Sequence, residues 1–335
     1  MSSSKINYNN NTNSILNNNN KNYAYQSLVF PLGAIAAFGF LANLILLSYI
    51  CCRRLYRNFV SSHFIAHLCV TNMIGLGVLV PLFLANLWSG THLWPNNNMA
   101  CRIQTFLMCS EWTVVHFMTL CIAGVHLLTF ARIHYAQLFG LPPAYLCVLA
   151  WIVAFTIALP CITNSHIVVH DPVLRHCVWG STDYSYKFLT YLLILCMGLP
   201  VGLSYYSYIK VLKIFYHSPI VFQSIGLYKS RFLVYAFLAG PLFQVPFYVI
   251  TMSGTWRFGP DSAIPVLAMF LGYAPSAISP LLYGLSLAQM KEEDMALTAR
   301  AHKSVMGHKH NNITTTLTKT NILGLRKIYR KNEGK

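Results

Sequence analysis

The sequence predicts an all-α membrane protein, a seven-transmembrane helix bundle, and three observations support this fold class. Of the 335 residues, 55% are hydrophobic and only 10% are charged, and the mean hydropathy is +0.49, whereas a water-soluble domain usually carries about 25% charged residues. Seven apolar segments are each longer than the ~20 residues that cross a bilayer as a helix. The loops between them concentrate basic residues on one side of the bilayer.

The seven segments cover most of the chain between residues 28 and 288. Their approximate limits are 28–52, 62–88, 102–130, 144–166, 187–213, 230–254 and 263–288. Several contain proline, which a spanning helix tolerates when neighbouring helices satisfy the freed carbonyl groups. Proline is poorly tolerated in soluble helix interiors, so these prolines agree with the membrane assignment.

The third segment is expected to lie at the centre of the bundle. Residues 101–132 are almost wholly apolar, yet they include one carboxylate, Glu111, and two histidines, His116 and His126. An ionisable side chain that faced lipid would cost several kcal/mol, so Glu111 should face other helices. The remaining segments would therefore surround this one.

Basic residues predict the orientation of the chain. Eighteen of the 24 lysines and arginines fall on one side of the predicted membrane and six on the other. The excess marks the cytoplasmic side, so the amino terminus is predicted outside the plasma membrane and the carboxyl terminus inside. The net charge of +16 thus follows membrane topology. No nucleic-acid partner is expected, because such proteins gather their charge on a soluble basic face.

Polar tails flank the bundle. Residues 1–27 form an asparagine-rich extracellular tail that is expected to be disordered, and Asn10 begins a glycosylation sequon there, although an asparagine tract also produces sequons by chance. Residues 289–335 form a cytoplasmic tail with a basic, threonine-rich end. The helical spacing of residues 287–297 predicts either a short amphipathic helix on the inner membrane surface or a continuation of the seventh segment.

Two of the ten cysteines fall on the outer side of the predicted membrane. Cys101 opens the third segment, and Cys177 lies in the long loop 167–186. A disulfide can persist on this oxidising side and would tie the loop to the third helix. The other eight cysteines lie in or beside apolar segments and are expected to be inert thiols.

The seven segments, the outside amino terminus and the Cys101–Cys177 pair resemble the rhodopsin-like (class A) G-protein-coupled receptors over roughly residues 28–297. Further landmarks of that family occur in order along the chain: Gly39 and Asn43, Trp94 seven residues before Cys101, Trp151 and Pro160, Pro200 and Tyr208, Pro246, and the run Ser279-Pro280-Leu281-Leu282-Tyr283.

Four positions that act as switches in the family differ here. Asn72 stands in place of the second-helix aspartate, and His126 in place of the third-helix arginine. Gln244 replaces the sixth-helix tryptophan, and Ser279 the seventh-helix asparagine. The resemblance therefore implies a divergent member, either an active receptor or one with little or no G-protein coupling.

The resemblance also implies an outer ligand pocket. Its candidate residues are Met108, Gln244, Phe247, Tyr248, Thr251 and Tyr273, with Leu192, Cys196 and Met269 beside them. Tyr273 stands where an opsin carries its retinal lysine, and Met108 where amine receptors carry aspartate, so neither ligand is expected. Ordinary helix packing remains the alternative, although Gln244 and Tyr273 would need polar partners if buried.

Basic residues lie above this predicted pocket. They are Arg102, Arg175, His176 and Arg257. They would either receive an anionic group of the ligand or form a solvated rim.

A second predicted site is polar and buried. Asn72 cannot supply the charge of the family's sodium site, but Glu111 on the third helix approaches the same place, with Ser276 and Ser279 as neutral donors. A sodium ion would accept such oxygen ligands. Two alternatives stay open: a protonated Glu111 that donates to Asn72 and binds no ion, or a Glu111 that reaches water near the outer headgroups.

The predicted switch and coupling residues lie toward the inner side. They are His126, Tyr208, Pro246, Pro280 and Tyr283. His126 is either a partly protonated cation that faces the inner partner or a neutral histidine hydrogen-bonded inside the bundle.

The expected function is that of a ligand-activated receptor. An unknown extracellular peptide or small molecule would rearrange the helices and so signal to a heterotrimeric G protein, to arrestin, or to both, and a receptor kinase could modify the threonine-rich tail. A seven-helix channel or transporter is the alternative, but no inverted repeat is evident. The chain has no HExxH, GxSxG or phosphate-loop motif, so neither an enzyme nor a cofactor is expected.

Overall fold

The computed structural model describes the backbone of residues 3–57, 59–89, 98–131, 142–217, 226–258 and 262–288. Side chains are described for residues 27–57, 59–89, 99–131, 142–214, 233–258 and 262–288. The chain divides into two units, Met1–Gly284 and Leu285–Lys335. The second unit is described only for residues 285–288, the last turn of a helix.

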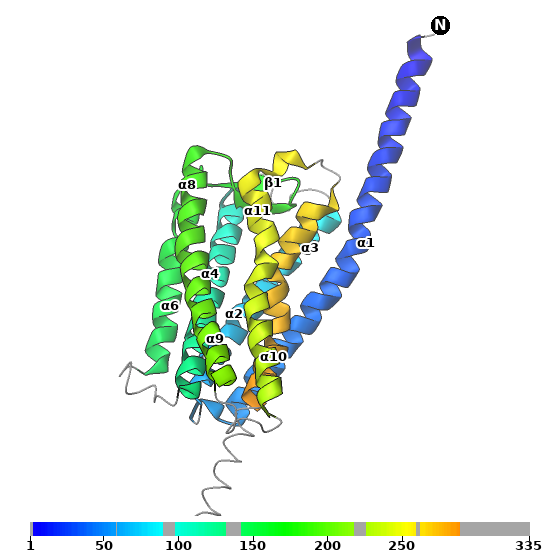
Figure 1. Cartoon of the computed structure of the whole chain (residues 1–335). Coiled ribbons are helices and arrows are strands. Elements are labelled where there is room, and N and C mark those ends of the chain that lie inside the picture. The colour runs from blue at the N-terminus through cyan, green and yellow to red at the C-terminus, as the bar shows by residue number, and fades with distance from the viewer. Residues whose placement is uncertain are drawn as a thin grey trace, which may run out of the picture. The chain divides into compact units, whose positions relative to one another are not determined.

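Seven helices are long and apolar enough to cross a membrane, and they form a bundle, so the predicted fold class is confirmed (Figure 1). The spans are Ser27–Cys52, Ser61–Ser89, Met99–Phe130, Pro143–Thr163, Asp183–Ile214, Leu233–Ser253 and Ala263–Ala288. These limits agree with those of the predicted apolar segments to within a few residues. The chain is therefore a multi-pass membrane protein.

The spans are assembled from shorter elements. In order they are α1 (Ser3–Cys52), η1 (Leu55–Arg57), α2 (Ser61–Ile74), η2 (Gly75–Leu79), α3 (Val80–Ser89), α4 (Asn98–Phe130), α6 (Pro143–Ala158), α7 (Pro160–Thr163), β1 (Val168–Asp171), β2 (His176–Trp179), α8 (Asp183–Leu192), η3 (Leu193–Gly198), α9 (Leu199–His217), α10 (Gly226–Ala239), η4 (Gly240–Gln244), α11 (Val245–Ser253) and η5 (Thr255–Arg257). The helix Ala263–Ala288 follows and forms the seventh span.

Prolines explain why four spans are interrupted. A proline lacks the amide hydrogen, and its ring clashes with the carbonyl four residues earlier, so the helix must widen, tighten or break there. Pro81 follows the π-helical turn η2, and Pro200 follows the π-helical turn η3. Pro160 lies two residues after the end of α6, and Pro246 two residues after the end of the 3₁₀ turn η4. The helix Ala263–Ala288 stays α-helical despite its prolines.

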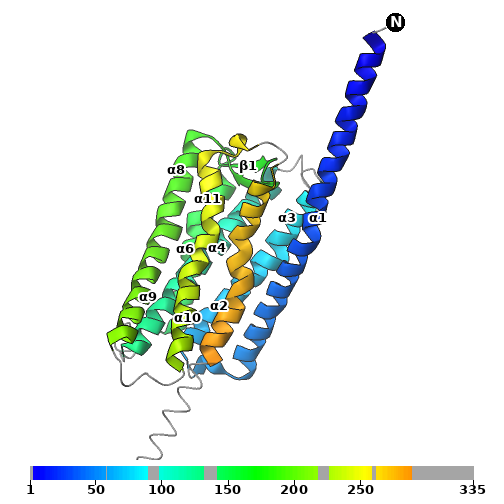
Figure 2. The same ribbon diagram turned by 45° about the vertical axis from the view of Figure 1, so that its right-hand side comes forward.

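The third span, α4, is the centre of the bundle, as expected from its buried polar residues. It packs against α2, α6 and α9, and at one end against both strands. The helix Ala263–Ala288, orange in Figure 2, lies beside α10 and α11. A glycine permits the close approach of this last helix to α1, because a Cβ on Gly39 would lie only 2.7 Å from the Cα of Ala277.

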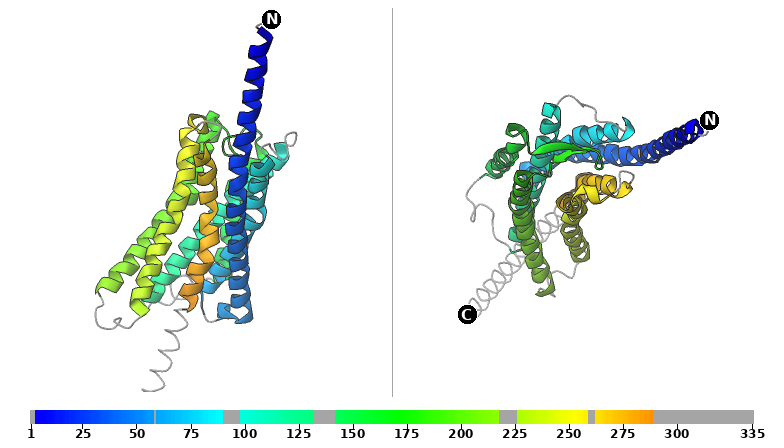
Figure 3. Two further views of the ribbon diagram at one scale, coloured as in Figure 1. Left: turned by 90° about the vertical axis from the view of Figure 1, so that its right-hand side faces the viewer. Right: turned by 90° about the horizontal axis from the view of Figure 1, so that it is seen from above.

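A two-stranded antiparallel hairpin covers one end of the bundle, where α4 begins (Figure 3, right). Its strands pair β1 with β2 so that His170 lies opposite Cys177. Every residue of β2 is buried. We call this the disulfide end of the bundle, and the other the opposite end.

The amino-terminal tail differs from the prediction. We expected residues 1–27 to be disordered, but α1 begins at Ser3 and projects beyond the other helices (Figure 1). Extending a helix that already exists needs no new nucleus, so an apolar span can carry helical structure into a polar stretch before it. The Asn10 side chain lies outside the described side chains, and its glycosylation stays a prediction.

Other expectations also fall outside the described residues. Trp94, the threonine-rich tail and nearly all of the segment 287–297 belong to this group. The short amphipathic helix on the inner membrane surface therefore stays a prediction.

Candidate functional site

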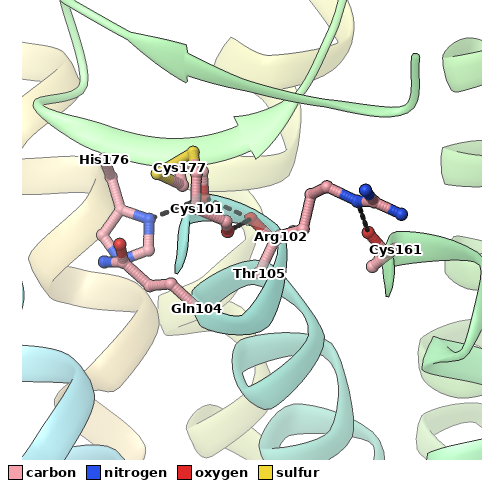
Figure 4. Close-up of a disulfide and its surroundings, with 7 residues drawn as sticks. All are labelled: Cys101, Arg102, Gln104, Thr105, Cys161, His176 and Cys177. Carbon is pink, nitrogen blue, oxygen red and sulfur yellow. Dashed lines mark hydrogen bonds between the residues drawn. A yellow bond between two sulfur atoms is a disulfide. The ribbon is translucent and has the colours of Figure 1, made fainter. Parts of the chain in front are cut away.

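The disulfide joins the start of α4 to the hairpin, as predicted (Figure 4). Cys101 and Cys177 are bonded, and their Cα atoms are 5.4 Å apart. The Thr105 hydroxyl, one turn further along α4, donates to the carbonyl oxygen of Cys177 at 3.0 Å. The hairpin is thus fixed to α4 by a covalent bond and a buried hydrogen bond.

His176 points into the protein, although we expected it on an exposed basic rim. Its side chain is fully buried, and its Nδ1 lies 2.8 Å from the Cys177 carbonyl oxygen (Figure 4). A carbonyl oxygen only accepts, so Nδ1 carries the hydrogen and Nε2 accepts from the Gln104 amide at 3.2 Å. Burial, with a smaller effect of the nearby His170, lowers the pKa of His176 to about 4, although its hydrogen bond to Cys177 acts in the opposite direction. The rim prediction is wrong here because strand β2 lies beneath β1.

The other three rim candidates lie in different places. Arg102 donates from Nε to the Cys161 carbonyl oxygen at 3.4 Å, which links α4 to α7 (Figure 4). Arg257 is exposed and lies over the ring of Trp256 at 5.3 Å. Arg175 is half-buried in the turn between the strands, with a left-handed φ of 53°. The four basic groups therefore do not form one anion-binding surface.

An aromatic cluster lies below the hairpin and contains three of the six predicted pocket residues, Phe247, Tyr248 and Tyr273. Trp112 is at its centre, with ring centroids 5.0 Å from Phe247, 5.7 Å from Tyr248 and 5.6 Å from Tyr273. Trp179 of β2 closes the cluster from above, 6.1 Å from Phe247. Phe247 of the sixth span thus contacts both Trp112 of α4 and Trp179 of the hairpin.

All six predicted pocket residues are buried. Their exposed fractions are 0% for Met108, Phe247 and Tyr273, 2% for Gln244, 5% for Tyr248 and 7% for Thr251. Two buried polar atoms of the cluster, Trp112 Nε1 and the Tyr273 hydroxyl, have no hydrogen-bond partner among the described residues. Buried groups of this kind usually have a partner, from protein, water or ligand. The packed aromatic cluster therefore keeps unused hydrogen-bonding capacity.

The hairpin is also tied to the end of the sixth span. The Thr255 hydroxyl donates to Asp171 Oδ2 at 2.6 Å, while Asp171 Oδ1 accepts from the amides of Val173 and Leu174. Asp171 thus shapes the turn after β1 and binds η5 at the same time. Displacement of this turn would break a hydrogen bond to the sixth-to-seventh connection.

A buried polar cluster lies next to the aromatic one, and it brings together all four predicted residues. Asn72 donates to the Ser279 hydroxyl at 2.8 Å, and the Ser276 hydroxyl donates to Glu111 Oε1 at 3.0 Å. Asn43 joins the two halves, because it accepts from Asn72 at 3.0 Å and donates to the Ser276 carbonyl oxygen at 2.9 Å. Four spans, the first, second, third and seventh, therefore share one hydrogen-bonded cluster.

Glu111 is enclosed. Its side chain is 2% exposed, which disagrees with the interpretation in which it reaches water. Gly75 makes room for it, since a Cβ there would lie 2.6 Å from Glu111 Oε1. The π-helical turn that begins at Gly75 lets the second span pass close to the carboxylate.

The oxygen atoms of this cluster suit a monovalent cation. Glu111 Oε2 and Asn72 Oδ1 have no hydrogen-bond partner among the described residues. The hydroxyl oxygens of Ser276 and Ser279 could act as uncharged ligands of a cation. One carboxylate with neutral oxygens suits a singly charged hard cation better than a divalent ion. No group of three His, Cys, Asp or Glu side chains lies together within the described part of the chain. A sodium ion therefore stays a prediction, as does the protonated carboxyl.

Three of the five predicted switch residues, His126, Tyr208 and Tyr283, form an aromatic stack with Phe237 toward the opposite end. His126 is 4% exposed, and its ring centroid is 6.2 Å from that of Tyr208 and 5.9 Å from that of Phe237. Phe237 stacks in turn on Tyr208 at 5.5 Å and on Tyr283 at 5.0 Å. His126 thus faces the bundle interior rather than an inner partner, and its Nε2 has no hydrogen-bond partner in the described ranges.

The two predicted switch prolines act on helix geometry. Pro246 follows the 3₁₀ turn η4 at the start of α11, where the sixth span changes from α10. Pro280 is buried within the seventh span, next to Ser279 of the polar cluster. Both prolines therefore lie where a span adjoins the clusters described above.

Several residues that organise this site were not among its predicted members. Asn43 was noted only as a landmark, and Trp112 and Phe237 were not singled out. A polar residue in an apolar first span, and a tryptophan next to Glu111, were the available signals.

The sequence matches no family model and no curated protein.

Proposed function

We propose that this protein is a ligand-activated receptor of the rhodopsin-like type, oriented with the disulfide end outside the plasma membrane. The orientation is supported by the excess of basic residues on the other side and by the disulfide, which needs an oxidising compartment. The ligand would act at the aromatic cluster, and a heterotrimeric G protein or arrestin would bind at the opposite end.

The observation that carries the proposal is the position of Trp112. Its ring touches the sixth span through Phe247 and Tyr248 and the seventh through Tyr273. The adjacent residue, Glu111, holds the polar cluster through Ser276. A ligand that satisfied the unpaired Trp112 Nε1 and Tyr273 hydroxyl would therefore act on three spans at once.

The same helix extends to the aromatic stack. Further along α4, His126 contacts Tyr208 of the fifth span and Phe237 of the sixth. Phe237 also contacts Tyr283 of the seventh span. A ligand that binds one of two helix arrangements more tightly shifts the population toward that arrangement. Binding at the aromatic cluster would in this way favour an arrangement in which the aromatic stack is open.

The test measures G-protein activation and arrestin recruitment in cells that display the chain at their surface, with and without a broad panel of peptides and small molecules. The informative variant is Trp112→Leu. Its control is Trp151→Leu, because Trp151 packs against Phe155 of its own helix at 5.4 Å. We expect a transducer response that Trp112→Leu changes at least about tenfold in potency and Trp151→Leu leaves intact.

Two outcomes would contradict the proposal. One is a surface-expressed chain that gives no transducer response, basal or ligand-dependent, above that of cells without it. The other is a response on which both tryptophan variants have the same effect at matched surface levels.

A further inference from the structure

A cavity of about 220 Å³ lies between the helices, on the far side of Gln244 from the aromatic cluster. It is bounded by α2, α4, α9, α10, η4 and the seventh span. Of the six predicted pocket residues, only Gln244 lines it. This cavity is therefore a different place from the ligand pocket that the resemblance implies.

Part of the cavity wall reaches the outer surface of two spans. Phe243 and Ile278 both line it, and they are 37% and 41% exposed on the outer surface of two spans. These residues lie near the middle of Leu233–Ser253 and Ala263–Ala288, which lie side by side in Figure 2. An outer surface at that height faces acyl chains. A molecule dissolved in the membrane would therefore reach the cavity without crossing water.

The lining is apolar except for six residues with polar side-chain groups: His116, Thr119, Ser204, Gln244, Ser279 and Tyr283. The His116 ring lies beside the Gln244 side chain, and the Thr119 hydroxyl donates to the Val115 carbonyl oxygen of its own helix. The Ser204 hydroxyl donates to the Pro200 carbonyl oxygen of its own helix, and the Ser279 hydroxyl accepts from Asn72. Gln244 donates through Nε2 to the Gly272 carbonyl oxygen at 3.2 Å. Its Oε1 has no hydrogen-bond partner among the described residues, although the side chain is only 2% exposed.

We propose that this cavity binds a small, mostly apolar alcohol from the bilayer, whose hydroxyl donates to Gln244 Oε1 and whose hydrocarbon part fills the space toward Phe243 and Ile278. A buried acceptor without a donor costs free energy, and a hydroxyl supplies the donor that an alkane lacks. A dry cavity of about 150 Å³ holds benzene, so by simple proportion 220 Å³ holds about nine non-hydrogen atoms. That is the size of octanol. The inference does not depend on the proposed receptor function, because binding is measured directly.

The test is photolabelling of the purified full chain in lipid nanodiscs with octanol that bears an aliphatic diazirine, followed by mass mapping. We expect saturable labelling of η4 and of the seventh span near Ile278, which unlabelled octanol competes. A diazirine-bearing octane, which has no hydroxyl, is expected to label these positions about five- to tenfold less, the effect of one hydrogen bond. Gln244→Leu should remove this difference between the two probes.

The cavity-filling variant is Gly240→Phe. Gly240 lines the cavity, and a Cβ on it meets no atom within 4 Å, so the ring enters open space. Gly202 in α9 is the matched control, because its added Cβ also meets nothing within 4 Å and it does not line the cavity. We expect Gly240→Phe to abolish the saturable labelling and Gly202→Phe to retain it.

Labelling that is spread evenly over all lipid-facing spans, or that excess octanol does not compete in the unmodified protein, would overturn the proposal. Neither measurement requires a variant to fold. Equal labelling of the two glycine variants would also overturn it.

Discussion

Buried polar side chains carry the chemistry of this protein at the residue scale. Glu111, Asn72 and Asn43 lie inside the membrane-spanning bundle, where an unpaired polar group is costly. Their mutual hydrogen bonds offset much of that cost, yet Glu111 Oε2 and Asn72 Oδ1 stay unpaired within the described residues. The cluster is therefore the place where substitutions of one atom should have the largest effect.

The first prediction concerns the charge in this cluster. In Asn72→Asp, the two hydrogen bonds that Asn72 donates are lost and a second carboxylate is placed in the cluster of Glu111, so we expect clear destabilisation. Adding Glu111→Gln removes the like charge and should restore part of the stability, with a coupling of about 0.5–3 kcal/mol. Thermal unfolding of the four purified proteins closes this double-mutant cycle.

Sodium provides the second arm of the same experiment. If the cluster binds the ion, replacing choline by sodium should raise the unfolding temperature of the unmodified protein and have no such effect on Glu111→Gln. Effects of the two substitutions that add to within about 0.5 kcal/mol would show that Asn72 and Glu111 do not share a site.

The second prediction concerns His176 and pH. Its pKa is lowered from 6.5 to about 4 by burial, so the unfolded chain binds this proton more readily than the folded one. Stability from this group is fully present above pH 6.5 and is lost as pH falls toward 4, by roughly 3 kcal/mol. Unfolding temperatures measured between pH 7 and pH 4 should fall less steeply for His176→Gln than for the unmodified protein. Parallel pH curves would show that His176 is not the titrating group.

At the scale of the elements, prolines and glycines decide how the helices fit together. Pro81 and Pro200 follow π-helical turns, and Pro246 follows a 3₁₀ turn. The wide turn at Gly75 brings the second span against Glu111, and Gly39 brings α1 against the seventh span. Irregular turns thus place the polar cluster, although each arises from a local sequence feature.

The third prediction follows from the close approach at Gly39. In Gly39→Ala the new methyl group would meet the backbone of Ala277 at 2.7 Å, so a helix must move, at a cost of about 1–3 kcal/mol. Gly33→Ala is the control in the same helix, because its methyl meets only a Leu84 side-chain atom at 3.5 Å. Alanine is a better helix former than glycine, so the control should be neutral or more stable. The thermal unfolding midpoints of the two variants test this, and equal midpoints would contradict the packing argument.

At the scale of the whole first unit, α4 connects the disulfide end to the opposite end. It contacts the hairpin, several neighbouring helices (among them α2, α6 and α9) and both clusters. The hairpin closes the disulfide end through Trp179 and through Asp171, which holds Thr255. The disulfide is the covalent part of this arrangement.

The fourth prediction concerns that disulfide. Cys101→Ser should lower surface expression and the unfolding temperature, because it frees a hairpin whose strand β2 is wholly buried; bridges of this kind contribute about 2–5 kcal/mol in small secreted domains. The double variant with Cys177→Ser should behave no worse than either single variant. Cys52→Ser is the control, since Cys52 is exposed and free. Mass mapping that found free thiols at both positions in the surface protein would contradict the prediction.

The sequence alone determined the number and limits of the spans, the central position of α4 and the Cys101–Cys177 bond. Hydropathy and span length are properties of consecutive residues, and they need no knowledge of the neighbours. The set of Asn72, Glu111, Ser276 and Ser279 was also predicted, because a resemblance placed these positions on facing helices. Disorder was expected for residues 1–27 from their polar composition alone. That expectation does not match the helix that begins at Ser3.

Only the tertiary structure decided which side chains meet. It brought Asn43 between Asn72 and Ser276, packed the expected pocket around Trp112 and turned His176 and His126 inward. It also located the cavity beside Gln244. These outcomes depend on how each helix is rotated and how closely its neighbours approach. Rotation and distance are set by glycines, proline-induced turns and side-chain packing between spans far apart in the chain, and a linear pattern of apolar residues does not contain them.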